Sequence, residues 1–277
     1  MKDQIVRLTK KFISIPSEPG NKKALDEILE LSLSYLKNYT IERFLHNGFK
    51  SALVHNVAKH PKKFKIILNV HLDVVPGKIG KYKPKLRGNK LYGVGSMDMK
   101  ASAACLILAF RLVAKKVSYP IALQLVTDEE IGGFNGTKHQ IDKGVRADFV
   151  IAGEPTNFDI VYKAKGVLLV KVVAKGQAAH GAYPWKGQNA IMTMNEFLNN
   201  LKKRYPMPVK EAWVTTVNVG TIETGNMSLN KIPDKCVVGL DVRFISQDSK
   251  TIIKDLQKLL PKNSSMKIIV NEPSLDT

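Results

Sequence analysis

Residues that commonly bind metal ions recur through the first half of the chain, each beside a short apolar run. They comprise one histidine and a series of acidic residues: His71, Asp73, Asp98, Glu129, Glu130 and Glu154. The apolar runs at 66–70, 122–126 and 149–152 have the length of buried strands. One imidazole and several carboxylates held close together would repel one another unless a cation lay between them. The pattern therefore predicts a metal site with hydrolytic chemistry.

Strands and helices alternate in this half of the chain, which favours a mostly parallel sheet with helices on both faces, an α/β fold. Hydrophobic spacing predicts helices at 3–13, 22–36, 99–115 and 136–143, and strands at 42–45, 51–54, 65–70, 120–127 and 148–153. The helix at 99–115 is apolar nearly all round, so we expect it to be buried. Ligands bind where the carboxyl ends of parallel strands meet, and we expect the metal-binding residues to gather there.

The order of elements changes after Glu154. Strands are expected at 167–174, 213–221, 235–244 and 266–271, with helices at 188–201 and 249–260. This β-α-β-β-α-β order is the signature of a ferredoxin-like sandwich, an α+β domain with an antiparallel sheet. We therefore place a catalytic metal-binding domain at 1–163 and a ferredoxin-like domain at 164–273.

Composition excludes several classes of protein. With 277 residues, 44% of them hydrophobic, the chain can form one large core or two ordinary ones, and no apolar run reaches membrane-spanning length. A net charge of +19 would suit a nucleic-acid binder, but the lysines are dispersed in ones, twos and threes and no nucleic-acid-binding motif is present. Dispersed charge is typical of a solvated surface. We expect neither a nucleic-acid nor a membrane partner.

Two features of the sequence indicate a cytoplasmic location. The N-terminal residues lack the uninterrupted apolar stretch and the small-residue cleavage site of a secretory signal. The two cysteines, Cys105 and Cys236, lie far apart in dissimilar contexts. Free thiols in a reducing compartment are a simpler interpretation of this pattern than a disulfide.

Three segments resemble the two-zinc amidohydrolase family of acetylornithine deacetylase, succinyl-diaminopimelate desuccinylase, aminoacylases and certain carboxypeptidases and dipeptidases. They are 71–77 (HLDVVPG), 93–100 (GVGSMDMK) and 127–133 (TDEEIGG). The likeness continues, in the family's order, through 153–156, 179–181 and 230–233, and so covers almost the whole chain. It implies a zinc-exopeptidase-like catalytic domain, a ferredoxin-like dimerisation or lid domain, and a homodimer formed through that second domain. It also implies two divalent metal ions, with zinc foremost and cobalt as the alternative.

The resemblance assigns metal-binding roles to four residues. His71 would bind one ion, and Asp73 would accept the N–H of its other ring nitrogen and so orient it. Asp98 would bridge the two ions, while Glu130 and Glu154 would each bind one of them. A lone histidine is commonly structural, and an aspartate before a helix is commonly an N-cap, so these roles depend on the series as a whole.

The remaining roles also come from the resemblance. Glu129 would be the general base, because neighbouring side chains at a strand end diverge and one of the pair can face the attacking water while Glu130 faces the metal. A negative neighbour and partial burial would raise the pKa of Glu129. His180 would stabilise the tetrahedral oxyanion, often from across a dimer. Asn230 and Arg243 would hold the substrate, although a structural salt bridge is an open alternative for Arg243.

One ligand of the family pattern has no counterpart. The family supplies a further histidine near the end of a longer chain, whereas this sequence has no histidine after His180. One ion would then keep only Asp98 and Glu130. Three interpretations compete: a fragment, a genuine truncation with impaired activity, or completion by a second polypeptide. The first is favoured, and we expect the 277-residue chain alone to be poorly active and to bind its second ion weakly.

The leading functional hypothesis is a metal-dependent hydrolase that cleaves the amide bond of N-acyl amino acids, of the deacetylase or desuccinylase kind. The nearest alternative is a carboxypeptidase or dipeptidase with the same machinery, because only the substrate pocket separates these activities. A third hypothesis is a truncated, inactive, dimerising relative that kept the fold and lost the chemistry. Metal content would separate the third hypothesis from the other two.

Overall fold

The computed structural model describes residues 1–276. These residues form two compact units, one at Met1–Phe158 and the other from Asp159 onward. None of the helices in the described part of the chain combines the length and the apolar character that a membrane span requires. Cys105 and Cys236 are both free thiols.

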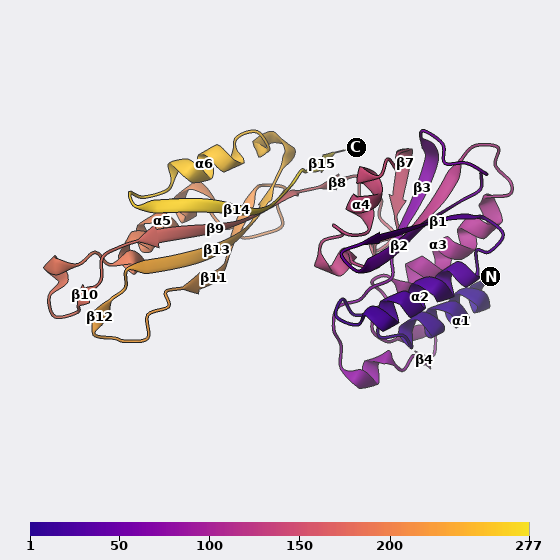
Figure 1. Ribbon diagram of the computed structural model, residues 1–277, viewed down its shortest axis with the longest axis horizontal. Coiled ribbons are helices and arrows are strands. Elements are labelled where there is room, and N and C mark those ends of the chain that lie inside the picture. The colour runs from indigo at the N-terminus through magenta and orange to yellow at the C-terminus, as the bar shows by residue number, and fades with distance from the viewer. Residues whose placement is uncertain (277) are drawn as a thin grey trace. The chain divides into compact units, whose positions relative to one another are not determined.

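The first unit is built on a mixed sheet (Figure 1). Its described strands, in spatial order, are β1 (Thr40–His46), β2 (Phe49–His55), β6 (Ile121–Val126), β3 (Phe64–His71) and β7 (Ala147–Ala152). β2 runs antiparallel to both of its neighbours, whereas β3 runs parallel to β6 and to β7. Consequently β1, β3, β6 and β7 share one direction, and the predicted mostly parallel sheet is confirmed.

Helices cover both faces of this sheet. On one face lie α1 (Lys2–Ile13), α2 (Lys22–Ser34) and α3 (Lys100–Val113) (Figure 1). Their apolar side chains join alternate residues of β3 and β6 in the main core. α2 begins at an N-cap, Asn21, whose side chain accepts the N–H of Ala24 at 3.2 Å. On the other face lies α4 (Thr137–Asp142), where the buried amide of Gln140 accepts from Gln124 and donates to Ser51. α3 buries one side, which includes Ala103, Ile107 and Phe110, whereas Cys105 and residues 111–113 are exposed. The helix is therefore less buried than its apolar composition predicts.

A short hairpin in the first unit was not predicted. It pairs β4 (Lys85–Arg87) with β5 (Lys90–Tyr92) and turns through Gly88, which has a φ of 55°. Glycine adopts this left-handed conformation without the steric cost that a Cβ would bring. Because each strand has only three residues, hydrophobic alternation carries no signal over this segment.

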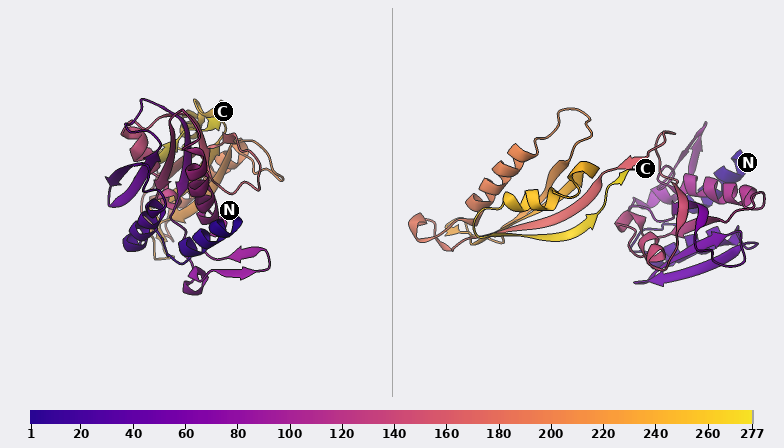
Figure 2. Two further views of the ribbon diagram at one scale, coloured as in Figure 1. Left: turned by 90° about the vertical axis from the view of Figure 1, so that its right-hand side faces the viewer. Right: turned by 90° about the horizontal axis from the view of Figure 1, so that it is seen from above.

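The second unit contains an antiparallel sheet with two helices on one face (Figure 2, right). The described strands of that sheet are, in spatial order, β11 (Thr216–Glu223), β13 (Lys235–Phe244), β9 (Gly166–Lys175) and β14 (Ser264–Glu272). Every second residue of β9 and β13 points into a core shared with α5 (Ala190–Arg204) and α6 (Ile252–Lys258). The chain order β9-α5-β11-β13-α6-β14 confirms the predicted ferredoxin-like sandwich.

Two element boundaries in this unit fall about three residues later than predicted. β11 begins at Thr216 because the preceding residue, Thr215, is engaged elsewhere: its hydroxyl donates to the carboxylate of Asp248 and accepts the N–H of Ile245. α6 begins at Ile252 because residues 246–248 form a separate 3₁₀ turn. Residues 163–164 form β8 (Lys163–Ala164), which pairs with β15 (Leu275–Asp276) inside the second unit.

Candidate metal centre

His71 is the focus of the acidic series in the first unit. It is the last residue of β3, and its side chain is 1% exposed. Its Nε2 lies 3.1 Å from Asp98 Oδ1, and 3.8 Å from both Glu129 Oε2 and Glu154 Oε1. These carboxylates come from the segments that follow β6 and β7 and that precede α3. The parallel strands β3, β6 and β7 thus bring residues far apart in sequence to one edge of the sheet, as their directions require.

Three of these residues form a group suited to a metal ion. The candidate ligand atoms of His71, Asp98 and Glu154 all lie within 4.8 Å of one another. Imidazole nitrogen with carboxylate oxygen is a donor set typical of zinc, and it also suits cobalt. The carboxylates of Asp98 and Glu154 are accessible, whereas the imidazole that they face is held in the core.

Two oxygens of Asp73 face the Nδ1 nitrogen of His71. The Nδ1 of His71 lies 3.0 Å from the main-chain carbonyl oxygen of Asp73 and 3.5 Å from its carboxylate Oδ1. A carbonyl only accepts, so Nδ1 carries a proton, and in the neutral ring Nε2 presents its lone pair to the acidic cluster. The other carboxylate oxygen of Asp73 accepts the main-chain N–H of Glu130 at 2.9 Å.

Glu129 and Glu130 diverge, as neighbours at a strand end should. They lie in a short 3₁₀ turn, Glu129–Ile131, that ends at Gly132 with a φ of 108°. Glu129 points toward His71, whereas the carboxylate of Glu130 accepts the main-chain N–H of Val75 at 3.2 Å. Glu129 is therefore placed beside the cluster of three ligands, and Glu130 is held outside it.

The electrostatics of this cluster are those of a site with too few positive charges. Burial lowers the pKa of His71, but the carboxylates of Asp73, Glu154 and Glu129 outweigh that effect and raise it to about 9. Burial, together with repulsion among the carboxylates, raises the pKa of Glu129, Glu130 and Glu154. A divalent cation would relieve this repulsion and could take the place of the proton on the imidazole.

A buried lysine next to the cluster does not supply the missing charge. Lys100, at the start of α3, is fully buried, and its Nζ donates to the carbonyl of Ile15 at 2.8 Å. Burial lowers the pKa of Lys100 to about 7, against the attraction of Asp73. Asp73 Oδ1 is itself a buried acceptor without a hydrogen-bond partner among the described residues. These observations fit a cation bound by the cluster. The sequence had not indicated a role for Lys100.

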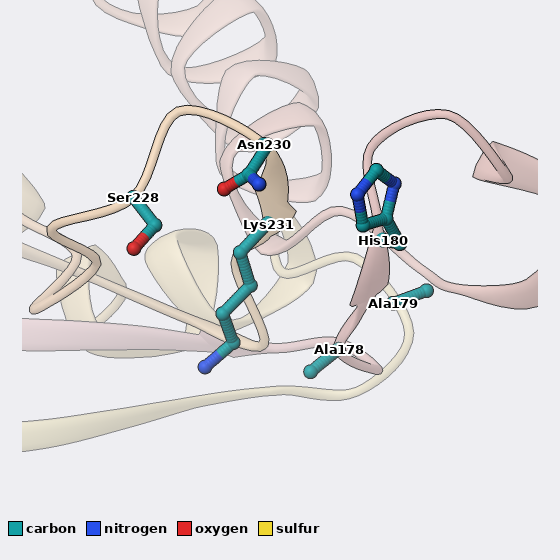
Figure 3. A pocket seen from close by; sticks show the side chains of 6 residues that line it. All are labelled: Ala178, Ala179, His180, Ser228, Asn230 and Lys231. Atoms are coloured by element: carbon teal, nitrogen blue, oxygen red, sulfur yellow. The ribbon is translucent and has the colours of Figure 1, made fainter.

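In the second unit, His180 and Asn230 line one pocket (Figure 3). β10 (Ala179–His180) pairs with β12 (Lys231–Ile232), and the N–H of Gly181 donates to the carbonyl of Asn230 at 2.7 Å. The pocket has a volume of about 340 Å³ and is lined by Ala178, Ala179, His180, Ser228, Asn230 and Lys231. The Nδ1 of His180 accepts the N–H of Ala182 at 3.1 Å, so the neutral ring keeps its proton on Nε2. That nitrogen is a hydrogen-bond donor.

Arg243 is not among the residues that line this pocket. It lies on β13, where its Nε and Nη2 donate to the two carboxylate oxygens of Asp241 at 2.7 and 3.1 Å. The structural salt bridge that the sequence left open is therefore present. A role for Arg243 in holding substrate stays a prediction.

The comparisons with known proteins agree with these observations. A family model described as the peptidase dimerisation domain matches residues 162–265. A probable carboxypeptidase of Emericella nidulans is 31% identical over 269 residues, which is 86% of this chain and 62% of the relative. Succinyl-diaminopimelate desuccinylase of Pelagibacter ubique is 30% identical over 212 residues, which is 69% of this chain and 55% of the relative. The chain thus spans about three fifths of the length of these relatives.

Solved structures share the fold over the full length described. Aminopeptidase PepT from Bacillus cereus has a TM-score of 0.77 at 19% identity, covering 100% of this chain and 78% of that one. The M20 family metallo-carboxypeptidase Sso-CP2 from Sulfolobus solfataricus has a TM-score of 0.77 at 18% identity, covering 99% and 79%. Together, these similarities confirm the resemblance that the motifs indicate and relate the chain to the M20 family of metallopeptidases.

Proposed function

We propose that this chain carries the metal centre of a hydrolase that cleaves the amide bond of N-acyl amino acids, of the deacetylase or desuccinylase kind. The observation that carries the proposal is the arrangement at His71, whose Nε2 faces Asp98 at 3.1 Å and both Glu129 and Glu154 at 3.8 Å. An imidazole held by a carbonyl and faced by several carboxylates is a donor arrangement suited to divalent zinc. Glu130, by resemblance, would contribute to a second ion.

A divalent ion bound there would supply a Lewis acid that polarises the amide carbonyl. Glu129 is the general base in this proposal. Its carboxylate accepts a proton from the attacking water and later delivers that proton to the nitrogen of the departing amine. Burial raises the pKa of Glu129, with further repulsion from Glu154, and a base whose pKa lies closer to neutral pH is better suited to both transfers.

The second unit would contribute substrate contacts and a dimer interface. The Nε2–H of His180 can donate to a tetrahedral oxyanion, and Asn230, which shares its pocket, can donate to the substrate. The match to a dimerisation domain over 162–265 supports a homodimer formed through this unit. We further propose zinc as the metal and the cytoplasm as the location.

A carboxypeptidase is the second candidate, because the Emericella nidulans relative bears that name. Both substrate classes present an amide whose nitrogen belongs to a residue with a free α-carboxylate. They differ on the acyl side, which is a small acyl group in one case and a peptide in the other.

The test is a panel of N-acetylornithine, N-succinyl-diaminopimelate, free dipeptides and N-blocked dipeptides, assayed with zinc-loaded and cobalt-loaded protein. The leading proposal expects the N-acyl amino acids to have the highest kcat/KM and Glu129→Gln to abolish their hydrolysis without loss of metal. Faster cleavage of the N-blocked dipeptides would favour the carboxypeptidase. A protein that binds no divalent metal at His71 would contradict both candidates.

A further inference from the structure

A second group of potential metal ligands lies in the first unit, away from the motifs that define the candidate metal centre. It consists of Glu42 on β1, His55 at the end of β2, and His60 in the connection between β2 and β3. Their candidate ligand atoms lie within 4.8 Å of one another. Sequence reasoning missed this group, because it forms only when β1 and β2 pair with Thr40 opposite His55.

The hydrogen bonds around His55 determine which nitrogen is available. Its side chain is fully buried, and its Nδ1 lies 2.9 Å from the carbonyl oxygen of Val57, which also accepts from the hydroxyl of Thr40 at 2.8 Å. A carbonyl only accepts, so Nδ1 is the protonated nitrogen. In the neutral ring, Nε2 then presents a lone pair. A histidine whose far N–H is held by a carbonyl is the usual arrangement of a metal ligand.

The unprotonated side of His55 faces an acceptor rather than a donor. Its Nε2 lies 2.8 Å from Glu42 Oε1, and the Nδ1 of His60 lies 2.9 and 3.0 Å from the two carboxylate oxygens of Glu42. Two imidazole nitrogens thus converge on one carboxylate. Either a proton or a metal ion must lie between each nitrogen and the oxygen that it faces.

The spacing of these atoms is close to that of a zinc site. Bonds of about 2.0–2.1 Å in a tetrahedral arrangement place neighbouring ligand atoms roughly 3.3 Å apart. The observed separations from Glu42 Oε1, 2.8 and 2.9 Å, require an opening of only a few tenths of an ångström. Phe64 packs against both rings, with ring centroids 5.5 Å from His55 and 5.3 Å from His60, and so limits their rotation.

We propose that Glu42, His55 and His60 form a second binding site for a divalent cation of the zinc type. Two imidazoles and one carboxylate would leave a fourth position, toward the partly exposed side of Glu42 and His60, for water. The ion would tie the β1–β2 hairpin to the connection that leads into β3, the strand that ends at His71. Its role would be to stabilise the fold.

Zinc binding by the full chain tests this proposal, with the candidate metal centre disabled by Asp98→Asn together with Glu154→Gln. Competition with a chromophoric chelator gives the affinity, and the thermal unfolding midpoint reports stabilisation by bound metal. We expect this double variant to bind one zinc per chain with a rise in the midpoint. Adding His60→Gln should weaken that binding at least about tenfold, since loss of a ligand costs no less than loss of a group that orients one.

A matched control is His46→Gln. It removes a histidine from β1, the strand that carries Glu42, and leaves Glu42, His55 and His60 in place. When His46→Gln is added to the double variant, the zinc affinity should not change. If the double variant fails to fold, metal content decides: His60→Gln alone should hold one zinc fewer per chain than the parent protein. No saturable zinc binding in the folded double variant, or equal affinity with and without His60, would overturn the proposal. An unfolding midpoint that responds to pH and not to zinc would show that protons alone occupy the group.

Discussion

The carboxylate of Asp73 accepts a hydrogen bond from the main-chain N–H of Glu130 at 2.9 Å. This bond joins the segment that follows β3 to the segment that follows β6, across 57 positions of sequence. One residue therefore acts on both sides of the site: its main-chain carbonyl orients His71, and its side chain holds the turn that carries the two glutamates. The expected role of Asp73 in orienting His71 stays a prediction.

Asp73→Asn tests whether the charge or only the shape of this side chain matters. The amide can keep its oxygen toward the N–H of Glu130, so the turn should persist. Loss of the negative charge removes an attraction for the bound cation and should weaken zinc binding roughly tenfold when measured above pH 9, where His71 is neutral. At lower pH the loss should be smaller, because the variant also lowers the pKa of His71 and so reduces competition from the proton. Zinc affinity measured by chelator competition checks this. Asp142→Asn, on the exposed face of α4 where Asp142 pairs with Lys138, is the control and should leave the affinity unchanged.

Glu129→Gln and Glu130→Gln should separate the two roles assigned to neighbouring residues. If Glu129 is the general base, its glutamine variant should retain zinc and lose kcat by about 10²–10⁴-fold. Glu130→Gln should lower metal content, because Glu130 is expected to bind an ion. Metal analysis alongside single-substrate kinetics gives both quantities. Loss of zinc in Glu129→Gln with full occupancy in Glu130→Gln would mean that the two assignments must be exchanged.

The sequence predicted the elements of the fold well wherever they are long and periodic. The strand expected at 65–70 is β3, and the helix expected at 99–115 is α3, each within two residues of the predicted ends. The predictions were less accurate at Thr215, where side-chain hydrogen bonds replace the pairing of a strand. They also failed for strands as short as β4 and β5. In such places tertiary contacts, and not local periodicity, decide where an element begins.

The sequence predicted which residues form the candidate site better than it predicted how they are held. His71, Asp98 and Glu154 come together because parallel strands align their carboxyl ends, a consequence that the chain order already contains. The details depend on main-chain groups that a sequence does not locate, such as the carbonyl that holds His71 and the N–H of Val75 that holds Glu130. The group at Glu42 depends on the register of a hairpin, and no spacing in the sequence indicates it.

Phe110→Ala and Leu112→Ala test how much the buried side of α3 contributes to the stability of the first unit. Both residues lie on α3, but Phe110 is fully buried and packs edge-on against Tyr39, with ring centroids 5.0 Å apart, while Leu112 is 45% exposed. Phe110→Ala should reduce the free energy of unfolding of the first unit by about 3–5 kcal/mol. Leu112→Ala should change it by no more than about 0.5 kcal/mol. Urea unfolding followed by circular dichroism provides the comparison.

An internal control for this pair is available in the second unit. The chain has two tryptophans, Trp185 and Trp213, and both lie beyond Asp159. Their fluorescence therefore reports the second unit. An equal shift of the fluorescence transition in Phe110→Ala would contradict a loss of stability confined to the first unit.

Zinc affinity at the candidate metal centre should depend on pH in a defined direction. In the metal-free chain the surrounding carboxylates overcome the effect of burial and raise the pKa of His71 to about 9, above its ordinary value of 6.5. A metal ion binds the neutral imidazole, so binding below pH 9 must displace one proton. The association constant should therefore rise about tenfold per pH unit up to roughly pH 9 and then level off.

The stability of the metal-free chain should change in the opposite sense. Because the folded-state pKa of His71 is raised, its contribution to the free energy of unfolding is fully present below about pH 6.5 and is lost as the pH rises through about 9. Calorimetric titrations in buffers of different ionisation enthalpy count the protons released on zinc binding, and urea unfolding of the metal-free chain over the same range gives the stability. His71→Gln should remove the dependence of zinc binding and the part of the stability dependence that falls as the pH rises. It should leave the opposite contribution of Lys100, whose pKa burial lowers to about 7. A zinc affinity that is flat between pH 6 and 8.5 in the parent protein would show that no proton is displaced from His71.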